Sequence, residues 1–243
     1  MEYGQDHAEL YDLVFRSRGK DFEAESEEHA RLIRSRFPAA KTLLDVACGT
    51  GAHLVTFARL FDHVEGLELT PAMRKVATKR LPESTVHEGN MLDFDLGRTF
   101  DAVTCLGNAI ASVGSAGEVA TTISRMAAHV VPGGVLIVEP WWFPEQFIDG
   151  YIGSHLAKEN GRVISRISHS SREGDRSRIE IQAIVADATG VKGYSDVLSV
   201  GLFTREQYET AFQNAGCAVE FVPGLRLGDG RPTSPGIFVG TRM

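Results

Sequence analysis

Two glycines in the stretch LLDVACGTGAHL, residues 43–54, are the first residues whose type and spacing indicate a ligand-binding site. Gly49 and Gly51 follow an apolar run that stops at an acid. Because glycine has no Cβ, the backbone there can approach a ligand closely and adopt conformations that other residues avoid. Glu68 stands 17 residues after Gly51, where a carboxylate can accept hydrogen bonds from both hydroxyls of a ribose. This pattern predicts a site for a cofactor that contains a nucleoside.

The same turn differs from the pattern of dinucleotide-binding proteins. A third glycine would be expected three residues after Gly51, to let helix and strand pack closely, but Leu54 stands there. Asp45 also precedes the glycines. An acidic turn is no obstacle to a ligand without a pyrophosphate, and it suits a ligand that carries a sulfonium and an amino group. The sequence therefore argues against NAD and NADP.

These residues need strands and helices that bring them together. Five strands are predicted over TLLDVA, HVEGLEL, STVHEGN, DAVTCLG and GGVLIVEP, with helical periodicity between them, and residues 8–37 are predicted to be helical. The stretches AVEFVP and GIFVGT add two strands near the end of the chain. The alternation predicts an α/β fold, with a doubly wound, mostly parallel, seven-stranded sheet and helices on both faces. In such sheets, ligands bind at the carboxyl ends of the strands.

A different pattern begins after EPWWFP. Residues 162–203 show no helical period, and apolar and polar residues alternate in SRIEIQAIV, which is typical of a half-buried antiparallel strand. The stretches GRVISRISHS and YSDVLSVGLF are its expected partners. We expect residues 1–150 and 204–243 to form the cofactor-binding domain. Residues 151–203 are expected to form a small antiparallel β insert that builds part of the acceptor site.

Composition restricts the class of protein. The net charge of -7 and the pI near 5.6 argue against a nucleic-acid polymer as partner. The three cysteines, Cys48, Cys105 and Cys217, are odd in number and far apart, which is typical of reduced thiols in a cytoplasmic protein and predicts no metal site. No apolar run is long enough to cross a bilayer, and the first residues do not form a signal peptide.

Together, LLDVACGTG and VEGLEL resemble the S-adenosylmethionine-dependent class I methyltransferases. The pieces DFDLGRTFDAVTC, PGGVLIVEPWWFPE, SHSSREG and LFTREQYETAF narrow the resemblance, nearly end to end, to the N,N-dimethyltransferases of dTDP-linked aminodeoxysugars in macrolide biosynthesis. The resemblance implies an enzyme that uses S-adenosyl-L-methionine, releases S-adenosyl-L-homocysteine, and turns the amino group of a nucleotide-diphosphate sugar into a dimethylamine.

The resemblance also implies which residues bind the cofactor. Tyr11 and Lys20, the latter in the GKDF segment, match an N-terminal lid over the cofactor. Asn90 stands where the family usually has an aspartate, and its carbonyl oxygen can still accept a hydrogen bond from the adenine amino group. The full set of matching positions is Tyr11, Lys20, Ala47, Gly49, Glu68, Leu69, Asn90, Met91, Leu92 and Leu106.

Two departures from the family pattern fall on the acceptor side. Relatives carry a histidine near the acceptor amine in a SSIGHL segment, whereas the aligned run here is NAIASV, with Ser112 at that position. Relatives also end with SGRGLF, but Pro235 stands here where the arginine would be. Arg226 or Arg231 could replace that positive charge. Cofactor use is therefore better defined by the sequence than the identity of the acceptor.

The expected chemistry needs no strong base. An α-amino group has a pKa of roughly 8, so part of it is unprotonated at neutral pH. Most of the rate can then come from holding the nitrogen, the methyl group and the sulfur in line. The candidates for guiding the proton away are Ser112, Glu139 and His169.

The candidates for contacts with the acceptor each have a structural alternative. Trp141 is expected either as a wall for the sugar or base, or as an ordinary core residue. Arg166 and Arg178 belong to a cluster of arginines in an acidic chain, which suits a diphosphate but also suits a solvated sheet face. Arg231 is the fourth candidate, and His53 is expected on the helix after the glycine turn without a chemical role.

Two rival functions remain at this point. O-methylation of a related sugar would need a poised base, because an alcohol loses its proton less readily than an amine. A non-catalytic S-adenosylmethionine-binding partner protein is the second rival, against which the retained EPWWFP and SHSSREG pieces argue. The expected partner is a small nucleotide sugar, and binding to a nucleic acid or a membrane is not expected. The sequence leaves open whether the protein forms a homodimer.

Overall fold

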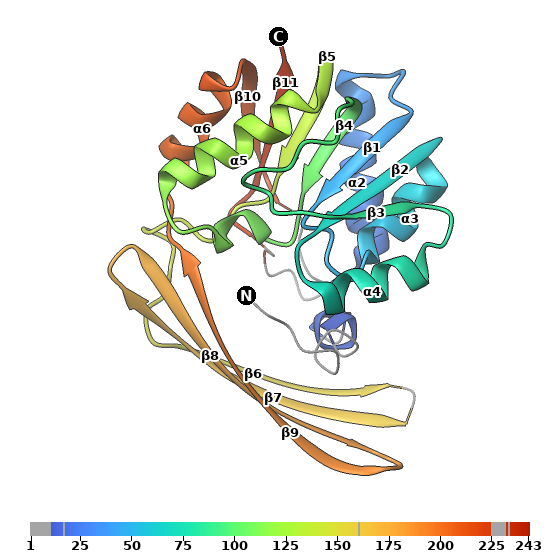
Figure 1. Cartoon of the computed structure of the whole chain (residues 1–243). Coiled ribbons are helices and arrows are strands. Elements are labelled where there is room, and N and C mark those ends of the chain that lie inside the picture. Colours follow the sequence, from blue (N-terminus) through green and yellow to red (C-terminus); the bar gives the residue numbers. More distant parts are fainter. Residues whose placement is uncertain (1–10, 17, 160, 225–231, 233) are drawn as a thin grey trace.

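The structure of the protein is a computed structural model that describes residues 11–16, 18–159, 161–224, 232 and 234–243. Two sheets account for its strands, one of seven strands and one of four. In Figure 1 the smaller sheet lies below the edge of the larger one at which β1, β2, β4 and β5 end. No helix in these ranges is both long and apolar enough to traverse a lipid bilayer.

The seven-stranded sheet has the order β10-β11-β5-β4-β1-β2-β3. Neighbours from β5 to β3 run parallel, whereas β11 is antiparallel to both β5 and β10. This confirms the predicted α/β class and all seven expected strands. Their bounds are β1 Thr42–Val46, β2 His63–Glu68, β3 Thr85–Glu88, β4 Phe100–Cys105, β5 Val130–Val138, β10 Cys217–Val222 and β11 Ile237–Arg242.

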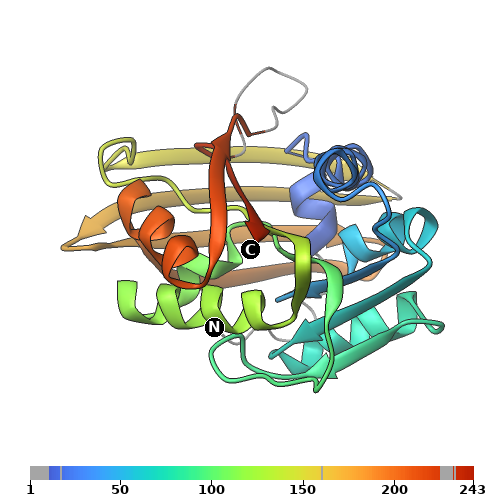
Figure 2. The same ribbon diagram turned by 90° about the horizontal axis from the view of Figure 1, so that it is seen from above.

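Helices cover both faces of this sheet, as Figure 2 shows from above. One face packs on α2 (Phe22–Arg36) and α3 (Ala52–Leu60), and the other packs on α5 (Ala116–Ala128) and α6 (Arg205–Asn214). The helix α4 (Pro71–Arg80) lies beside β3, at the edge of the sheet.

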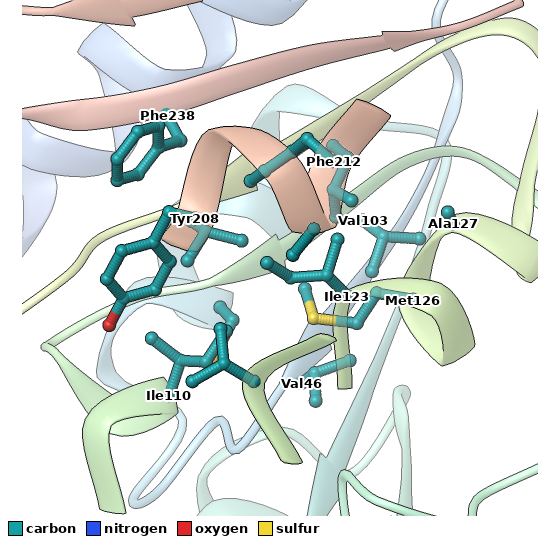
Figure 3. Close-up of a cluster of buried hydrophobic side chains, with 14 of the residues drawn as sticks. Val46, Val103, Ile110, Ile123, Met126, Ala127, Tyr208, Phe212 and Phe238 are labelled. Carbon is teal, nitrogen blue, oxygen red and sulfur yellow. The ribbon is translucent and has the colours of Figure 1, made fainter. Parts of the chain in front are cut away.

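The core under α5 and α6 is rich in aromatic side chains (Figure 3). Tyr208 stacks on Phe238 with 5.0 Å between ring centroids, and Ile123 and Phe212 are fully buried beside them. Apolar side chains from one face of each helix thus meet those of the strands in one packed layer on each side of the sheet. This packing makes the carboxyl edge of the sheet a rigid platform.

The expected single helix over residues 8–37 is divided in two, and its first residues lie outside the described ranges. Residues 11–16 are helical, and α2 begins only at Phe22. The break has a local cause, because Gly19 has a φ of 90°, a conformation that ends helices. Asp21 then restarts the helix as N-cap, since its Oδ1 accepts hydrogen bonds from the N–H groups of Glu23 and Ala24.

The second sheet contains one strand more than expected. It consists of β6 (Tyr151–Glu159), β7 (Arg162–Glu173), β8 (Arg176–Asp187) and β9 (Gly190–Gly201), in that order and all antiparallel. The first of these strands was not predicted from the sequence. Residues 151–203 as the limits of a separate insert remain a prediction.

One face of this second sheet packs on the rest of the molecule, and we call it the inner face. It carries Ala157, Ile164 and Val185, which contact Leu13 and Val14 of the N-terminal helical segment. Further along the strands it carries Ile179 and Val200, which contact Ala111 and Trp141. Because side chains alternate along a strand, the residues between these positions belong to the opposite, outer face.

Candidate functional site

The glycine turn lies between β1 and α3, at the carboxyl edge of the sheet. Ala47, Gly49 and Gly51 all have positive φ values, of 57°, 58° and 73°, so the chain bends sharply where most side chains would be strained. At Gly51 a Cβ would also stand 3.1 Å from Leu81 Cδ1. At Gly49 no described neighbour lies within 4 Å of the Cβ position, which leaves open space for a ligand against the backbone.

Glu68 ends β2 directly beside this turn. Its Oε2 accepts a hydrogen bond of 2.9 Å from the Gly49 N–H, and its Oε1 accepts one of 2.7 Å from the Thr70 N–H. The side chain is only 7% exposed. A carboxylate has about four lone-pair sites, so both oxygens can accept further hydrogen bonds. Glu68 is thus held in place with free acceptor sites before any ligand binds, as the prediction of a ribose contact requires.

The remaining residues expected to contact the cofactor lie mostly at the ends of β2 and β3. Leu69, expected with Glu68 at the ribose and methionine part, follows Glu68 and is 54% exposed. Asn90 Oδ1 accepts a hydrogen bond from the Leu92 N–H, which fixes the turn after β3, and Met91 and Leu92 pack half-buried against the core. Leu106, by contrast, has a buried side chain directed into the core on the α2 and α3 side, so only its backbone can face a ligand.

The N-terminal helical segment is tied to the glycine turn. Thr50 Oγ1 donates a hydrogen bond of 2.6 Å to Asp12 Oδ1, and Arg80 forms an ion pair of 2.6 Å with Asp12 and donates to the Thr50 carbonyl. Sequence reasoning missed this contact. The acid next to Tyr11 and the threonine between the glycines were visible, but their pairing spans 38 residues, and no local pattern encodes it.

Tyr11 is held against the acids of the site. Its pKa is raised, first by burial and then by the charges of Asp12, Glu68 and Glu139. Glu68 ends β2, Glu139 follows β5, and Asp12 is next to Tyr11 in the chain. Because their charges and burial all raise the pKa of Tyr11, its hydroxyl stays protonated at neutral pH.

Lys20 and Glu139 complete this cluster. Glu139 follows β5, is 4% exposed, and accepts a hydrogen bond of 2.7 Å from the Gly107 N–H. Lys20 Nζ lies 2.7 Å from Glu25 Oε2 in a largely buried ion pair. Burial lowers the pKa of Lys20, but the charges of Glu139 and Glu25 raise it by a larger amount. The net pKa is therefore above its usual value, and the ammonium stays charged.

Asp45, the acid before the turn, has a different place from the one the sequence suggested. It is 2% exposed within β1, and Thr104 Oγ1 donates a hydrogen bond of 2.7 Å to its Oδ1. Burial raises the pKa of this carboxyl to about 6, although His53 and Thr104 act in the opposite direction. Asp45 therefore supports the turn from below and does not present its side chain to a ligand.

The acceptor-side candidates are divided between the two faces of the smaller sheet. Trp141 packs on Ala111, Ile179 and Val200, where it joins the sheet to the rest of the molecule, and Ser112 is exposed in the short helix η1 (Ala109–Ser112) beside it. These contacts agree with a structural role for Trp141 and leave Ser112 accessible.

Two of the acceptor-side expectations require correction. His169 lies on the outer face, 3.9 Å from Glu180, and Arg178 pairs with the same Glu180 at 2.6 Å. The residues on either side of His169 in the chain are Ser168 and Ser170, and both are buried on the inner face. The side chains of His169 and Arg178 thus point away from Glu68 and Glu139, so neither reaches the candidate site of its own chain. The expectation failed because alternation shows that two faces exist but does not show which one is covered.

Arg166, in contrast, lies on the inner face. Its Nη1 donates a hydrogen bond of 3.0 Å to Ser168 Oγ. Burial, followed by the charge of Arg18 from the N-terminal segment, lowers its pKa to about 10. The charges of two arginines from different parts of the chain therefore act on one another. The fourth acceptor candidate, Arg231, lies outside the described residues, as does Arg226.

Three kinds of comparison agree on the relatives of this chain. Residues 43–134 match a family model described as a methyltransferase domain. The chain is 44% identical, over 99% of its length and 94% of the relative, to a dTDP-4-amino-2,3,4,6-tetradeoxy-D-glucose N,N-dimethyltransferase of Saccharopolyspora spinosa. It is 46% identical, over 98% of its length and 92% of the relative, to a dTDP-3-amino-3,6-dideoxy-alpha-D-glucopyranose N,N-dimethyltransferase of Streptomyces fradiae.

A solved structure resembles the whole molecule as well. It is the S-adenosylmethionine-bound form of CalS10, an amino pentose methyltransferase from Micromonospora echinaspora that is involved in calicheamicin biosynthesis. The TM-score is 0.88 at 49% sequence identity, and the match covers 96% of this chain and 97% of that one. The similarity thus includes the insert and the N-terminal segment as well as the glycine turn.

Proposed function

The chain belongs to the S-adenosylmethionine-dependent methyltransferases, in the family of the dTDP-aminodeoxysugar N,N-dimethyltransferases, and we propose that it methylates the amino group of a dTDP-linked aminodeoxysugar. The observation that carries the proposal is Glu68. It is buried and held by two backbone N–H groups beside the open turn at Gly49, in a chain that matches enzymes of this activity over nearly its full length.

The residues present fit S-adenosylmethionine. Glu68 offers free lone pairs for two ribose hydroxyls, and the space over Gly49 lets a ligand lie against the backbone. Lys20 offers a buried positive charge for the carboxylate of the methionine part. Leu69, Met91 and Leu92 offer apolar surface for adenine. Tyr11 and Asp12 close the site from the N-terminal side.

When bound, S-adenosylmethionine supplies a methyl group that is attached to a positively charged sulfur. The positive charge makes this sulfur a good leaving group. The chain then has to bind the amine in its neutral form, exclude water, and align it with that methyl group. A neutral fraction of the amine exists near neutral pH, because its pKa is roughly 8. Glu139, buried in the cluster of Tyr11 and Lys20, is the group best placed to hold the proton that the amine loses.

The nucleotide diphosphate of the acceptor is proposed to bind on the inner face of the smaller sheet. The charge of Arg18 lowers the pKa of Arg166, and an anion bound to both guanidinium groups would relieve their repulsion. Arg166 shares this face with Ser168 and Ser170, and Trp141 packs against the same face. Arg178, on the outer face, is no longer a candidate for this role.

One experiment tests the function directly. The protein is incubated with S-adenosylmethionine and a panel of dTDP-3-amino-, dTDP-4-amino- and dTDP-hydroxysugars, and the products are analysed by mass spectrometry. A mass gain of one or two methyl groups on an aminosugar is expected. Methylation of the hydroxysugars alone would replace the proposal with O-methylation, and a protein that binds the cofactor but yields no product would be a non-catalytic partner.

We further propose that the enzyme is a homodimer that associates through the outer face of the smaller sheet. Six apolar side chains, each more than half exposed, lie on that face: Ile152, Leu156, Ile167, Ile184, Val191 and Val197. Apolar groups of this number on one surface are typical of an interaction site, and a sheet face can pack on its own copy about a two-fold axis. Analytical ultracentrifugation should give a dimer for the wild type and a monomer for Leu156→Lys/Ile184→Lys.

The cytoplasm is the proposed location. Cys48, Cys105 and Cys217 are all free and buried, and thiols persist in this form in reducing compartments.

A further inference from the structure

A second polar cluster lies behind the cofactor cleft, between α2 and the first turn of α3. His53 is its centre: its Nε2 lies 2.9 Å from Glu25 Oε2, and its carbonyl oxygen accepts a hydrogen bond of 3.3 Å from Ser26 Oγ. The ring also packs edge-on against Phe22, with 5.0 Å between centroids. His53 stands two residues after Gly51, so the cluster borders the turn that the cofactor approaches.

Glu25 connects this cluster to Lys20. The same oxygen that His53 contacts, Oε2, lies 2.7 Å from Lys20 Nζ. All three side chains are at most 10% exposed. Glu25 stays ionised throughout, since hydrogen bonds and charges from His53 and Lys20 outweigh its burial and lower its pKa to about 2. The row His53, Glu25 and Lys20 therefore forms a fixed path from α3 to the cofactor cleft.

Lys20 has donors to spare at the end of this path. An ammonium group carries three N–H donors, and the contact with Glu25 occupies one of them. The charge of Glu139, which follows β5 at the carboxyl edge of the larger sheet, also acts on Lys20. The remaining donors are thus available to a ligand group that binds at this edge.

A purely structural explanation of the cluster is weak. Packing α2 against α3 does not require buried charges, because Ser26 and Phe22 already make contacts between the two helices. Removing three ionisable groups from water is costly, and apolar residues of the same size often stabilise a protein as well or better. The buried row is better explained as a means of orienting Lys20, its last member.

We propose that Glu25 and His53 are positioning residues that hold the ammonium of Lys20 toward the carboxylate of the methionine part of S-adenosylmethionine. Neither residue touches the cofactor itself. His53 fixes the Glu25 carboxylate, and Glu25 fixes the rotamer of Lys20. The inference rests on the proposed cofactor but not on the proposed acceptor.

The test compares two ligands that differ in the amino-acid part of the cofactor. S-adenosylhomocysteine carries that part with its carboxylate, whereas 5′-methylthioadenosine shares the adenosine and the thioether but lacks both the carboxylate and the amino group. Calorimetry on Glu25→Gln and His53→Leu should show S-adenosylhomocysteine binding weakened roughly tenfold or more, the effect of a misplaced charged hydrogen bond. Binding of 5′-methylthioadenosine should be unchanged in both variants, which also shows that they are folded.

Three further variants make the result specific. His53→Gln keeps a side-chain amide near the Nε2 position and should restore most of the affinity for S-adenosylhomocysteine. Glu23→Gln removes the exposed partner of Arg59 on the same two helices and should change neither ligand. In a Lys20→Met background, Glu25→Gln should have little further effect, because the group that it positions is gone.

Each outcome decides the proposal. Equal losses for both ligands would assign Glu25 and His53 to the general packing of the site, and wild-type affinity in both variants would also overturn the positioning role. The proposed function fails separately, since it depends on products formed from aminosugars. A wild type that binds S-adenosylhomocysteine but methylates no sugar would leave the positioning role intact.

Discussion

At the scale of single residues, the cofactor site consists of groups that are fixed before a ligand arrives. Both oxygens of Glu68 already accept backbone hydrogen bonds, from Gly49 and from Thr70. Little ordering of this side chain is then needed on binding, so the proposed hydrogen bonds to the ribose should contribute to affinity almost in full.

Glu68→Ala should therefore weaken the binding of S-adenosylmethionine by about 1.5–3 kcal/mol, the range for hydrogen bonds to a charged group. Calorimetry measures the change. Glu88→Ala is the matched control, because Glu88 is an acid at the end of the neighbouring strand that pairs with Arg74 instead. An unchanged affinity in Glu68→Ala would show that another residue holds the ribose.

His29 has a less favourable environment than any residue of the cofactor site. It is 1% exposed on α2, and within the described part of the chain neither ring nitrogen has a hydrogen-bond partner. Burial, followed by the charge of His53, lowers its pKa from 6.5 to about 3. The unfolded chain thus takes up a proton near pH 6.5 that the folded chain refuses until about pH 3.

The sign of the effect follows from this difference. The contribution of His29 to stability is complete above about pH 6.5 and falls as the pH decreases toward about 3, by at most about 1.4 kcal/mol per pH unit. His29→Leu removes this titration. Thermal unfolding should therefore show an advantage of the variant over the wild type that grows between about pH 7.5 and about pH 5. A difference between the two proteins that stays constant across this pH range would contradict the prediction.

At the scale of elements, the smaller sheet shows what a sequence pattern can and cannot determine. Alternation in SRIEIQAIV predicted a half-buried strand, and β8 has that pattern, with Ile179 buried and Glu180 exposed. The direction of each face was not predictable, because it depends on contacts with Leu13, Ala111 and Trp141, which are far away in the chain.

The two arginines of this sheet give a direct test of its faces. Arg166→Ala should raise the KM for the nucleotide sugar, because it removes an inner-face cation from the proposed diphosphate site. Arg178→Ala should leave that KM unaltered, since its side chain pairs with Glu180 on the outer face. Steady-state kinetics with saturating cofactor measures both. A normal KM in Arg166→Ala would move the diphosphate site to another part of the cleft.

The same contrast explains which site residues the sequence revealed. Gly49, Gly51 and Glu68 were recognisable because one turn and one neighbouring strand determine their geometry. The contacts of Asp12 and His53 were not recognisable from the sequence, because the partner of each residue is 28 or more positions away. His53 was even expected to have no chemical role, since a single histidine on a helix face carries no local signal.

At the scale of the whole molecule, the N-terminal segment connects two other parts. It contacts the glycine turn through Asp12 and the inner face of the smaller sheet through Leu13 and Val14. Such an arrangement favours catalysis by alignment and exclusion of water, an effect that can supply roughly 7–11 kcal/mol.

Single replacements of polar residues in the cleft should then have moderate effects. Ser112→Ala and Glu139→Gln should each lower kcat by less than the roughly 10²–10⁴-fold expected on loss of a true general base. The kcat/KM of both variants should rise with pH along the titration of the acceptor amine, as in the wild type. Loss of more than about a thousandfold in one variant, with disappearance of the acidic limb, would identify that residue as a base and favour a hydroxyl acceptor.

The smaller sheet is only one layer thick, and this has a consequence for protein engineering. In β7 the even-numbered residues Ile164, Arg166 and Ser168 lie on the inner face, and the odd-numbered residues Ser165 and Ile167 lie on the outer one. If the proposed diphosphate site and the proposed dimer contact lie on these two faces, substrate range and subunit association can be diversified in separate libraries that randomise alternate codons of the same strand. Deleting one codon would exchange the two sets of side chains, and should be far more damaging than any single replacement among them.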